Sequence, residues 1–177
     1  EGQLNLGLMY ANGKGIKINY KKAVYWYIKA AEQDQAEAQL NLGLMYKYGR
    51  GVEENYTQAV FWFNKAAEKG FAEAQTNLGL MYEYGKGVKQ DYMEAISWYE
   101  KAAEQDDVTA QLSLALFYKF GKGVPKDYTK VFYWYKKAAE LGDTGAQLNL
   151  GFMFQFGKGV EQDYEEAVTW YKKSAER

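Results

Sequence analysis

The stretch LMYKYGRGVEENYTQAVFWFNKAAEKG, from Leu44 to Gly70, decides how this chain folds. It holds two glycines around a basic residue, Gly49-Arg50-Gly51, and such a turn is either a cradle for a phosphate group or a bend between two helices. A phosphate loop needs a preceding strand and either more glycines or a Gly-Lys-Ser/Thr run that leads into a helix. Neither occurs here, so the sequence predicts a bend, with the Arg50 side chain in solvent near a helix end.

The same pattern recurs along the chain at a fixed step of 36 residues. Glycine pairs and a glutamine keep this step, and so do the tryptophans, at Trp26, Trp62, Trp98, Trp134 and Trp170. A fixed period of this length is typical of proteins built from repeated supersecondary units. The sequence therefore predicts a single array of five repeats, at residues 1–36, 37–72, 73–108, 109–144 and 145–177.

Each repeat is predicted to be a helix, a turn and a second helix. In the second repeat, apolar residues at helical spacing cover one face of residues 38–48, and Gly49 stands where a helix end favours positive φ. Asn55 is a good N-cap for a second helix with an apolar stripe over residues 56–67. The equivalent caps are Asn19, Asp91, Asp127 and Asp163. The predicted fold class is all-α, a solenoid of helix pairs.

The apolar stripe of each second helix also predicts a stabilising role for its tryptophan. In a solenoid each repeat contacts only its neighbours, so damage in the middle splits the array. We therefore expect Trp98→Ala to destabilise the fold more than Trp170→Ala.

The composition excludes several kinds of chemistry. The net charge is −1, so no uniform basic field points to nucleic acid or to an anionic membrane. The absence of cysteine and histidine removes disulfides, thiol and imidazole catalysis and the usual zinc ligands. No apolar run approaches the ~20 residues that span a bilayer. We therefore expect no metal, no cofactor, no nucleic acid partner and no membrane insertion.

The third repeat carries a motif that resembles the Sel-one-like repeat family, a group related to tetratricopeptide repeats. Its residues are Leu78, Gly79, Tyr82, Gly85, Gly87, Val88, Asp91, Tyr92, Ala95, Trp98, Tyr99, Ala102, Ala103 and Glu104. The resemblance covers the whole chain, with departures at Ala115, Val131, Phe154 and Ser174. It implies a right-handed superhelix whose first helices line a concave surface, and adaptors or scaffolds for protein complexes. Many members are bacterial and many are exported, so cytoplasm, periplasm and secretion all stay open.

The sequence shows no catalytic constellation. Some relatives have been labelled β-lactamase-like, and that chemistry needs a serine with a lysine three residues later. None of Ser97, Ser113 and Ser174 has that neighbour. Adjacent carboxylates such as Asp106 and Asp107 fall at loop positions, where a solvated surface explains them. We expect no enzyme activity, and an accessory domain of an enzyme is the remaining catalytic alternative.

A second face of the first helix in each repeat is the candidate binding surface, and the resemblance makes it the concave wall. The candidates are Asn5, Leu8, Asn41, Leu44, Tyr48, Asn77, Leu80, Tyr84, Leu116, Phe120, Asn149, Phe152 and Phe156. The leucine positions have a second reading, packing between adjacent first helices. The aromatic positions nearest the turn, where the first repeat has Asn12, suggest partly exposed contact residues. The asparagines either hold an extended peptide backbone or bond to the next helix or loop.

The sequence thus predicts a protein-binding adaptor that takes a peptide or a partner's helix on the concave surface. The alternative is a structural spacer, or part of a longer array with its binding site elsewhere. Because the chain starts at Glu1 without methionine and neither end has a polar cap, we expect either a piece of a longer array or ends that another molecule covers. The open apolar stripe of the last helix, with Val168 and Tyr171, is expected to drive weak self-association.

Overall fold

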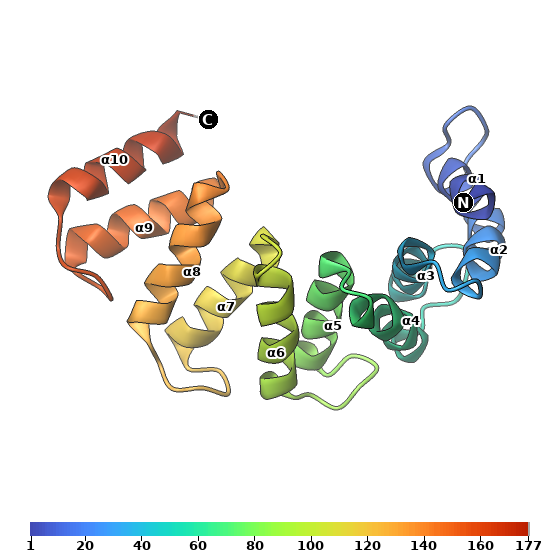
Figure 1. Cartoon of the computed structure of the whole chain (residues 1–177), viewed down its shortest axis with the longest axis horizontal. Helices are drawn as coiled ribbons and strands as arrows, with labels where there is room; N and C mark the ends of the chain where they lie inside the picture. The colour runs from blue at the N-terminus through green and yellow to red at the C-terminus, as the bar shows by residue number, and fades with distance from the viewer. Residues whose placement is uncertain (177) are drawn as a thin grey trace. The chain divides into compact units, whose positions relative to one another are not determined.

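The computed structural model describes residues 1–176, which are all α-helical in their regular structure and contain no strand. Figure 1 shows the helices in chain order. They are α1 (Gly2–Asn12), α2 (Tyr20–Ala31), α3 (Ala36–Tyr48), α4 (Tyr56–Glu68), α5 (Ala72–Tyr84), α6 (Tyr92–Ala103), α7 (Val108–Phe120), α8 (Tyr128–Glu140), α9 (Thr144–Phe156) and α10 (Tyr164–Ala175). We call the odd-numbered helices A helices and the even-numbered ones B helices. The predicted all-α fold of helix pairs is confirmed.

The helices gather into two compact units, one from Glu1 to Asp91 with α1–α5 and one from Tyr92 onward with α6–α10. In the first unit α2 packs on α1 and α3, and α4 packs on α3 and α5. In the second unit α7 packs on α6 and α8, and α9 packs on α8 and α10. Within each unit, α2, α4 and α8 therefore pack both on their own A helix and on the next one.

The turn from an A helix to a B helix uses its two glycines differently. Gly49 ends α3 in the left-handed conformation, with φ 62°, as predicted. Gly51 also has positive φ, and a Cβ placed on it would lie 2.4 Å from the carbonyl carbon of Tyr20, in the first turn of α2. The same close approach joins Gly87 to Tyr56 and Gly159 to Tyr128. The second glycine therefore lets the turn lie directly on the preceding repeat.

The predicted N-caps are confirmed in four repeats. The side chain of Asn55 accepts a hydrogen bond from the backbone N–H of Gln58 at 3.0 Å, which satisfies a donor that the helix leaves unpaired. The backbone N–H of Asn55 also donates to the carbonyl of Tyr46 at 2.9 Å and closes the turn onto α3. The equivalent side-chain caps are Asn19, Asp127 and Asp163.

The core of a repeat is an aromatic ring laid on a small residue. Phe63 of α4 is fully buried, and a Cβ on Gly43 of α3 would lie 2.6 Å from two of its ring carbons. Gly7 under Tyr27 and Gly151 under Tyr171 repeat this pairing. Because glycine has no side chain, the two helices can approach closely enough for the ring to contact the glycine backbone.

In the first four repeats the buried aromatic is the residue that follows the tryptophan, at Tyr27, Phe63, Tyr99 and Tyr135. Tyr99 is fully buried, whereas Trp98 is only half-buried, with the Nζ of Lys101 3.9 Å from the centre of its ring. Trp170 is the more buried tryptophan, at 8% exposure. The expectation that Trp98→Ala destabilises the fold more than Trp170→Ala assumed that Trp98 is the more buried of the two, and this assumption is wrong. The indole of Trp98 borders the surface, and Tyr99 fills the core.

The recurrent glutamine ties successive repeats together. The side chain of Gln39 in α3 is fully buried, and its Nε2 donates to the carbonyl of Ala31, at the end of α2, at 3.2 Å. The same bond forms from Gln75 to Ala67, from Gln111 to Ala103 and from Gln147 to Ala139. A buried amide needs a partner, and this carbonyl at the end of a helix supplies one. The sequence showed the period of the glutamine but not this role.

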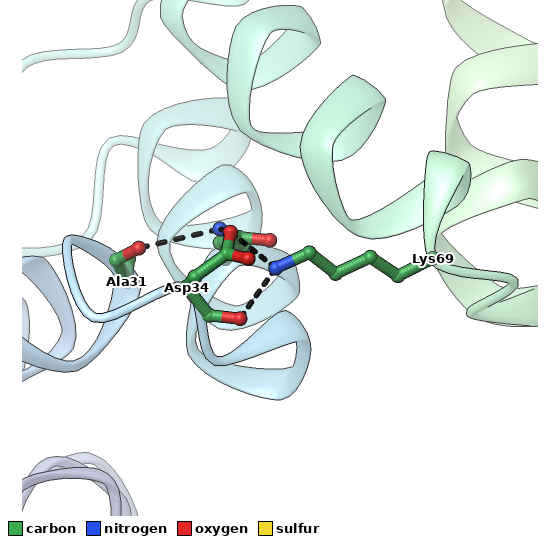
Figure 2. A network of polar contacts seen from close by, with 4 residues as sticks. Ala31, Asp34 and Lys69 are labelled. Carbon is green, nitrogen blue, oxygen red and sulfur yellow. Dashed lines mark hydrogen bonds and ion pairs between the residues drawn. The ribbon is translucent and has the colours of Figure 1, made fainter.

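A polar contact also joins the B-to-A junctions of the first two repeats (Figure 2). Asp34 adopts a left-handed conformation, with φ 65°, and Lys69 at the end of α4 donates from its Nζ to both the carbonyl and the carboxylate of Asp34. Gln39 adds a hydrogen bond to the same carboxylate at 3.1 Å. The hydrogen bond from Lys69, followed by that from Gln39, holds the pKa of the Asp34 carboxyl below its usual value.

Candidate functional site

Four large aromatic side chains project into solvent at the turn end of the A helices. Tyr48 is 55% exposed, and Tyr84, Phe120 and Phe156 are 61%, 57% and 53% exposed. Asn12 at the equivalent place in α1 is also exposed. Side chains that leave more than half of their surface in water contribute little to the core, so folding alone does not explain an aromatic residue there.

The leucine candidates divide by their depth on the A helices. Leu8, Leu44 and Leu80 are half-buried, while Leu116 and Phe152 are exposed. One turn earlier, Leu40 is buried, as expected for packing between helices. Packing between adjacent A helices therefore explains Leu40. The candidates at the position of Leu44 are only partly buried or exposed, so part of each side chain remains accessible.

A pocket recurs where the turn of one repeat meets the A helix of the next, and we call it the turn-end pocket. The first unit has two. One has a volume of about 180 Å³, and its lining includes Leu8, Tyr20, Asn41, Leu44, Met45, Tyr48 and Arg50. The other has a volume of about 330 Å³ and is lined by Lys47, Tyr48, Glu54, Tyr56, Leu80, Met81, Tyr84 and Lys86. Tyr48 lines both pockets, so it stands between two neighbouring hollows.

The second unit repeats the turn-end pocket between its last two repeats. This copy has a volume of about 50 Å³, and its lining includes Lys119, Tyr128, Asn149, Phe152, Met153 and Lys158. Tyr128, Met153 and Lys158 occupy the repeat positions that Tyr56, Met81 and Lys86 occupy in the larger pocket. The pocket is therefore formed by equivalent positions of different repeats and does not depend on the conformation of one particular loop.

The asparagine candidates use part of their amide within their own helix. The Nδ2 of Asn41 donates to the carbonyl of Glu37 at 2.9 Å, and Asn149 donates to Gly145 at 2.8 Å. Asn77 makes the same bond to Glu73 and also accepts a hydrogen bond from the Nζ of Lys47 at 2.7 Å. Asn77 thus bonds to a neighbouring helix, α3, which is one of the two predicted roles. Asn41 and Asn149 use only their amide nitrogen within the helix, so their amide oxygen can accept from another donor. Asn5 is exposed.

The cation between the two glycines is exposed at Arg50, Lys86 and Lys158, as the sequence predicts, and in these three repeats it also lies over an aromatic ring. The Nζ of Lys86 lies 4.8 Å from the ring centre of Tyr56 in the preceding repeat and 3.5 Å from its hydroxyl. Arg50 lies over Tyr20 at 5.9 Å, and Lys158 over Tyr128 at 6.0 Å. An aromatic face attracts a cation, so each of these cations is positioned on the wall of a turn-end pocket.

Sequence reasoning missed a second set of exposed aromatics, on the B helices. Tyr25, Phe61 and Tyr133 are each about half exposed and stand edge-on to the tryptophan that follows, for example at 4.9 Å between the rings of Phe61 and Trp62. The signal was an aromatic residue directly before the tryptophan in three repeats. None of these three side chains lines a turn-end pocket.

The described residues hold neither a candidate metal cluster nor a helix that could span a membrane. Within residues 1–176 no three aspartate or glutamate side chains gather in a way that suits a metal ion. No helix in that range is both long and apolar enough to cross a membrane. The pocket walls carry tyrosines, apolar groups, amides and cations, which are groups that recognise another molecule.

The fold defines an all-α repeat protein with a recurring pocket, and the comparisons with known proteins name its class. The Sel1 repeat model matches five times, at residues 1–35, 36–71, 72–107, 108–143 and 144–177, so the chain belongs to the Sel1 repeat family. The borders differ by one residue from those predicted. Sel1 repeat proteins are in general scaffolds for protein interactions.

Two solved structures are similar to this chain in both sequence and fold. One is c5321, a protective antigen of uropathogenic Escherichia coli strains, with 42% identity and a TM-score of 0.96 over 98% of this chain. The chain spans only 37% of that antigen. The other is a Sel1 repeat protein from Oxalobacter formigenes, with 42% identity and a TM-score of 0.90 over 98% of this chain and 71% of its own.

A more distant structure shares the fold alone. An immunity protein from Pseudomonas aeruginosa has 20% identity and a TM-score of 0.51 over 88% of this chain and 74% of its own. The two relatives at 42% identity come from bacteria, which points to a bacterial origin for this chain. No curated protein sequence matches the chain.

Proposed function

We propose that this chain is a protein-interaction module that binds a peptide or a segment of a partner protein on the A-helix face. The turn-end pockets and the exposed aromatic residues between them form the contact surface. The observation that carries the proposal is the position of Tyr48. It is 55% exposed and lines both pockets of the first unit. An exposed aromatic flanked by two hollows is the arrangement expected of an anchor residue.

The size of the pockets favours side chains over a cofactor. Pockets for cofactors and other small molecules usually have volumes of roughly 300–1,000 Å³. Of the three turn-end pockets, only the one at Tyr56 and Tyr84, at about 330 Å³, reaches this range, and its copies measure about 180 Å³ and about 50 Å³. In the first unit, two small hollows one repeat apart suit a partner segment that presents one side chain to each.

The experiment uses the full chain as bait for a partner and then measures the affinity of the purified partner for matched variants. Tyr48→Ala and Tyr84→Ala remove anchors at the turn-end pockets. Tyr25→Ala and Phe61→Ala are the controls, because these aromatics have similar exposure but lie on B helices. A hot-spot aromatic contributes about 2 kcal/mol or more, so we expect each anchor variant to bind about 30-fold more weakly.

The alternative functions give different results in the same measurement. A structural spacer tolerates both anchor replacements without losing its partner. If the two control variants weaken binding instead, the B-helix face is the contact surface and the proposal is wrong. Thermal unfolding of all four variants shows that any loss is not a loss of folding.

A further inference from the structure

Every described turn-end pocket contains a positive charge, although the whole chain has a net charge of −1. Arg50, Lys86 and Lys158 each reach a pocket from the turn of the later repeat. Two of the pockets have a second lysine, Lys47 or Lys119, from the end of the A helix before it. Among the pocket linings, the only carboxylate is that of Glu54. Each pocket is therefore a locally cationic place on a chain that is not basic.

The pocket cations are held in place without being neutralised. The guanidinium of Arg50 lies 5.4 Å from the ring centre of Tyr48, and the Nζ of Lys158 lies 5.2 Å from that of Phe152. In residues 1–176, Arg50, Lys86 and Lys158 make no ion pair with a carboxylate. A cation on an aromatic face keeps N–H groups that point away from the ring, and these can donate to an anion.

The other walls of the same pockets are apolar or aromatic. Leu80 and Met81 line the larger pocket beside Tyr84, and Leu44 and Met45 take the same places in its neighbour. A ligand that satisfies such a site needs a negative group and an apolar group close together. An acidic residue next to a leucine, isoleucine or aromatic residue in a peptide has both.

We infer that the partner segment is an acidic peptide. Its aspartate or glutamate side chains bind the cations Arg50, Lys86 and Lys158, while adjacent apolar side chains enter the turn-end pockets. This inference rests on the proposed function and specifies the chemistry of its partner. Because Tyr48 stands between two pockets of the first unit, two such acidic–apolar pairs bind side by side there. A single-stranded nucleic acid is the rival anion, since bases also stack on aromatic residues. The net charge of −1 and the aliphatic pocket walls favour the peptide.

The test selects binders from a phage-displayed library of random dodecapeptides with the full chain as target. The selected peptides are synthesised, and their affinities are measured for the wild type and for two triple variants. The first, Arg50→Gln, Lys86→Gln and Lys158→Gln, removes the cation that each turn contributes and keeps Lys47 and Lys119. The control variant removes the same charge from exposed lysines outside the pockets, at Lys17, Lys21 and Lys136. Thermal unfolding confirms that both variants are folded.

We expect the selected peptides to be enriched in acidic residues next to apolar ones, relative to the unselected library. The pocket variant should bind them about tenfold more weakly or worse, because each charged hydrogen bond contributes about this factor. The control variant should stay within about twofold of the wild type.

The other outcomes separate the inference from the proposed function. Selected peptides that are neutral or basic, yet lose binding to Tyr48→Ala, overturn the acidic partner and leave the binding face in place. If no peptide depends on Tyr48, both fail. If an oligonucleotide of mixed sequence, titrated in parallel, binds more tightly than any selected peptide and loses affinity for the pocket variant, the ligand is nucleic acid and the inference is wrong.

Discussion

Replacing Phe63 with alanine tests the ring-on-glycine core, and its neighbour Phe61 supplies a matched control in the same helix. Phe63 is fully buried, and its ring lies on Gly43, which has no side chain to fill the space left behind. Such a truncation costs about 3–5 kcal/mol of the free energy of unfolding, since it loses apolar burial and leaves a cavity. Phe61 is 49% exposed and loses mainly its edge-on contact with Trp62, which is worth about 1 kcal/mol.

The two variants should therefore differ by about 2–4 kcal/mol in stability. With a urea dependence of about 1–3 kcal/mol per molar, this difference separates their unfolding midpoints by about 0.7–4 M. Far-UV circular dichroism in a urea series measures both midpoints against the wild type. Equal shifts for Phe61→Ala and Phe63→Ala would refute the assignment of the core to the residue after the tryptophan.

Three further predictions concern the turn, the pH dependence and the last helix. Gly51→Ala should be clearly less stable to urea than Gly70→Ala, because both glycines have positive φ but only a Cβ at Gly51 meets backbone, that of Tyr20, at 2.4 Å. Burial raises the pKa of Tyr27 to about 12, above its unfolded value of about 10, so its contribution to stability is complete below about pH 10 and is lost as the pH rises through about 12. The difference in unfolding free energy between wild type and Tyr27→Phe, followed by denaturation at several alkaline pH values, should change over that window and stay constant below it. Val168 is 49% exposed, whereas its equivalent in α4, Val60, is buried, so we expect weak self-association in light scattering at high concentration that Val168→Lys abolishes. A strict monomer at all concentrations, or an association that Val168→Lys leaves intact, would contradict this.

Most of the fold could be predicted because its signals are local and repeated five times. The glycine after an A helix, as at Gly49, and the cap before a B helix, as at Asn55, each act on a few neighbouring residues. Their positions relative to an apolar stripe give the helix pair directly. The exposed aromatic row with Tyr48 could be recognised because it lies off that stripe.

The parts that the sequence did not reveal depend on contacts between repeats. Gly51 looks like a flexible hinge until Tyr20 of the preceding repeat is seen beneath it. The buried bond from Gln39 to Ala31 also needs the next helix in place. Whether Trp62 or Phe63 enters the core depends on which ring meets Gly43. Both aromatics belong to the apolar stripe of the helix, so the stripe alone does not decide between them.

The predicted contact residues stay a prediction, and the structure adds pockets beside them that the sequence did not indicate. The candidates Leu44, Leu80 and Phe152 do line turn-end pockets, but the pockets themselves require the tyrosine that begins a B helix and the cation of the next turn. The tyrosine and cation of one pocket, such as Tyr56 and Lys86, are 30 residues apart in the chain. No single motif contains both, so the sequence alone could not place the exposed cation beside that tyrosine.

The central claim is that partners bind at the turn-end pockets, and the five methionines give a direct test. Met45, Met81 and Met153 line the pockets, whereas Met9 and Met93 do not and are exposed. The measurement is the methyl spectrum of the chain labelled with carbon-13 at methionine, recorded during titration with a selected peptide. Binding at the pockets predicts that the resonances of Met45 and Met81 shift and saturate together, while that of Met93 stays in place. Saturable binding that shifts Met93 and leaves Met45 and Met81 unchanged would contradict it.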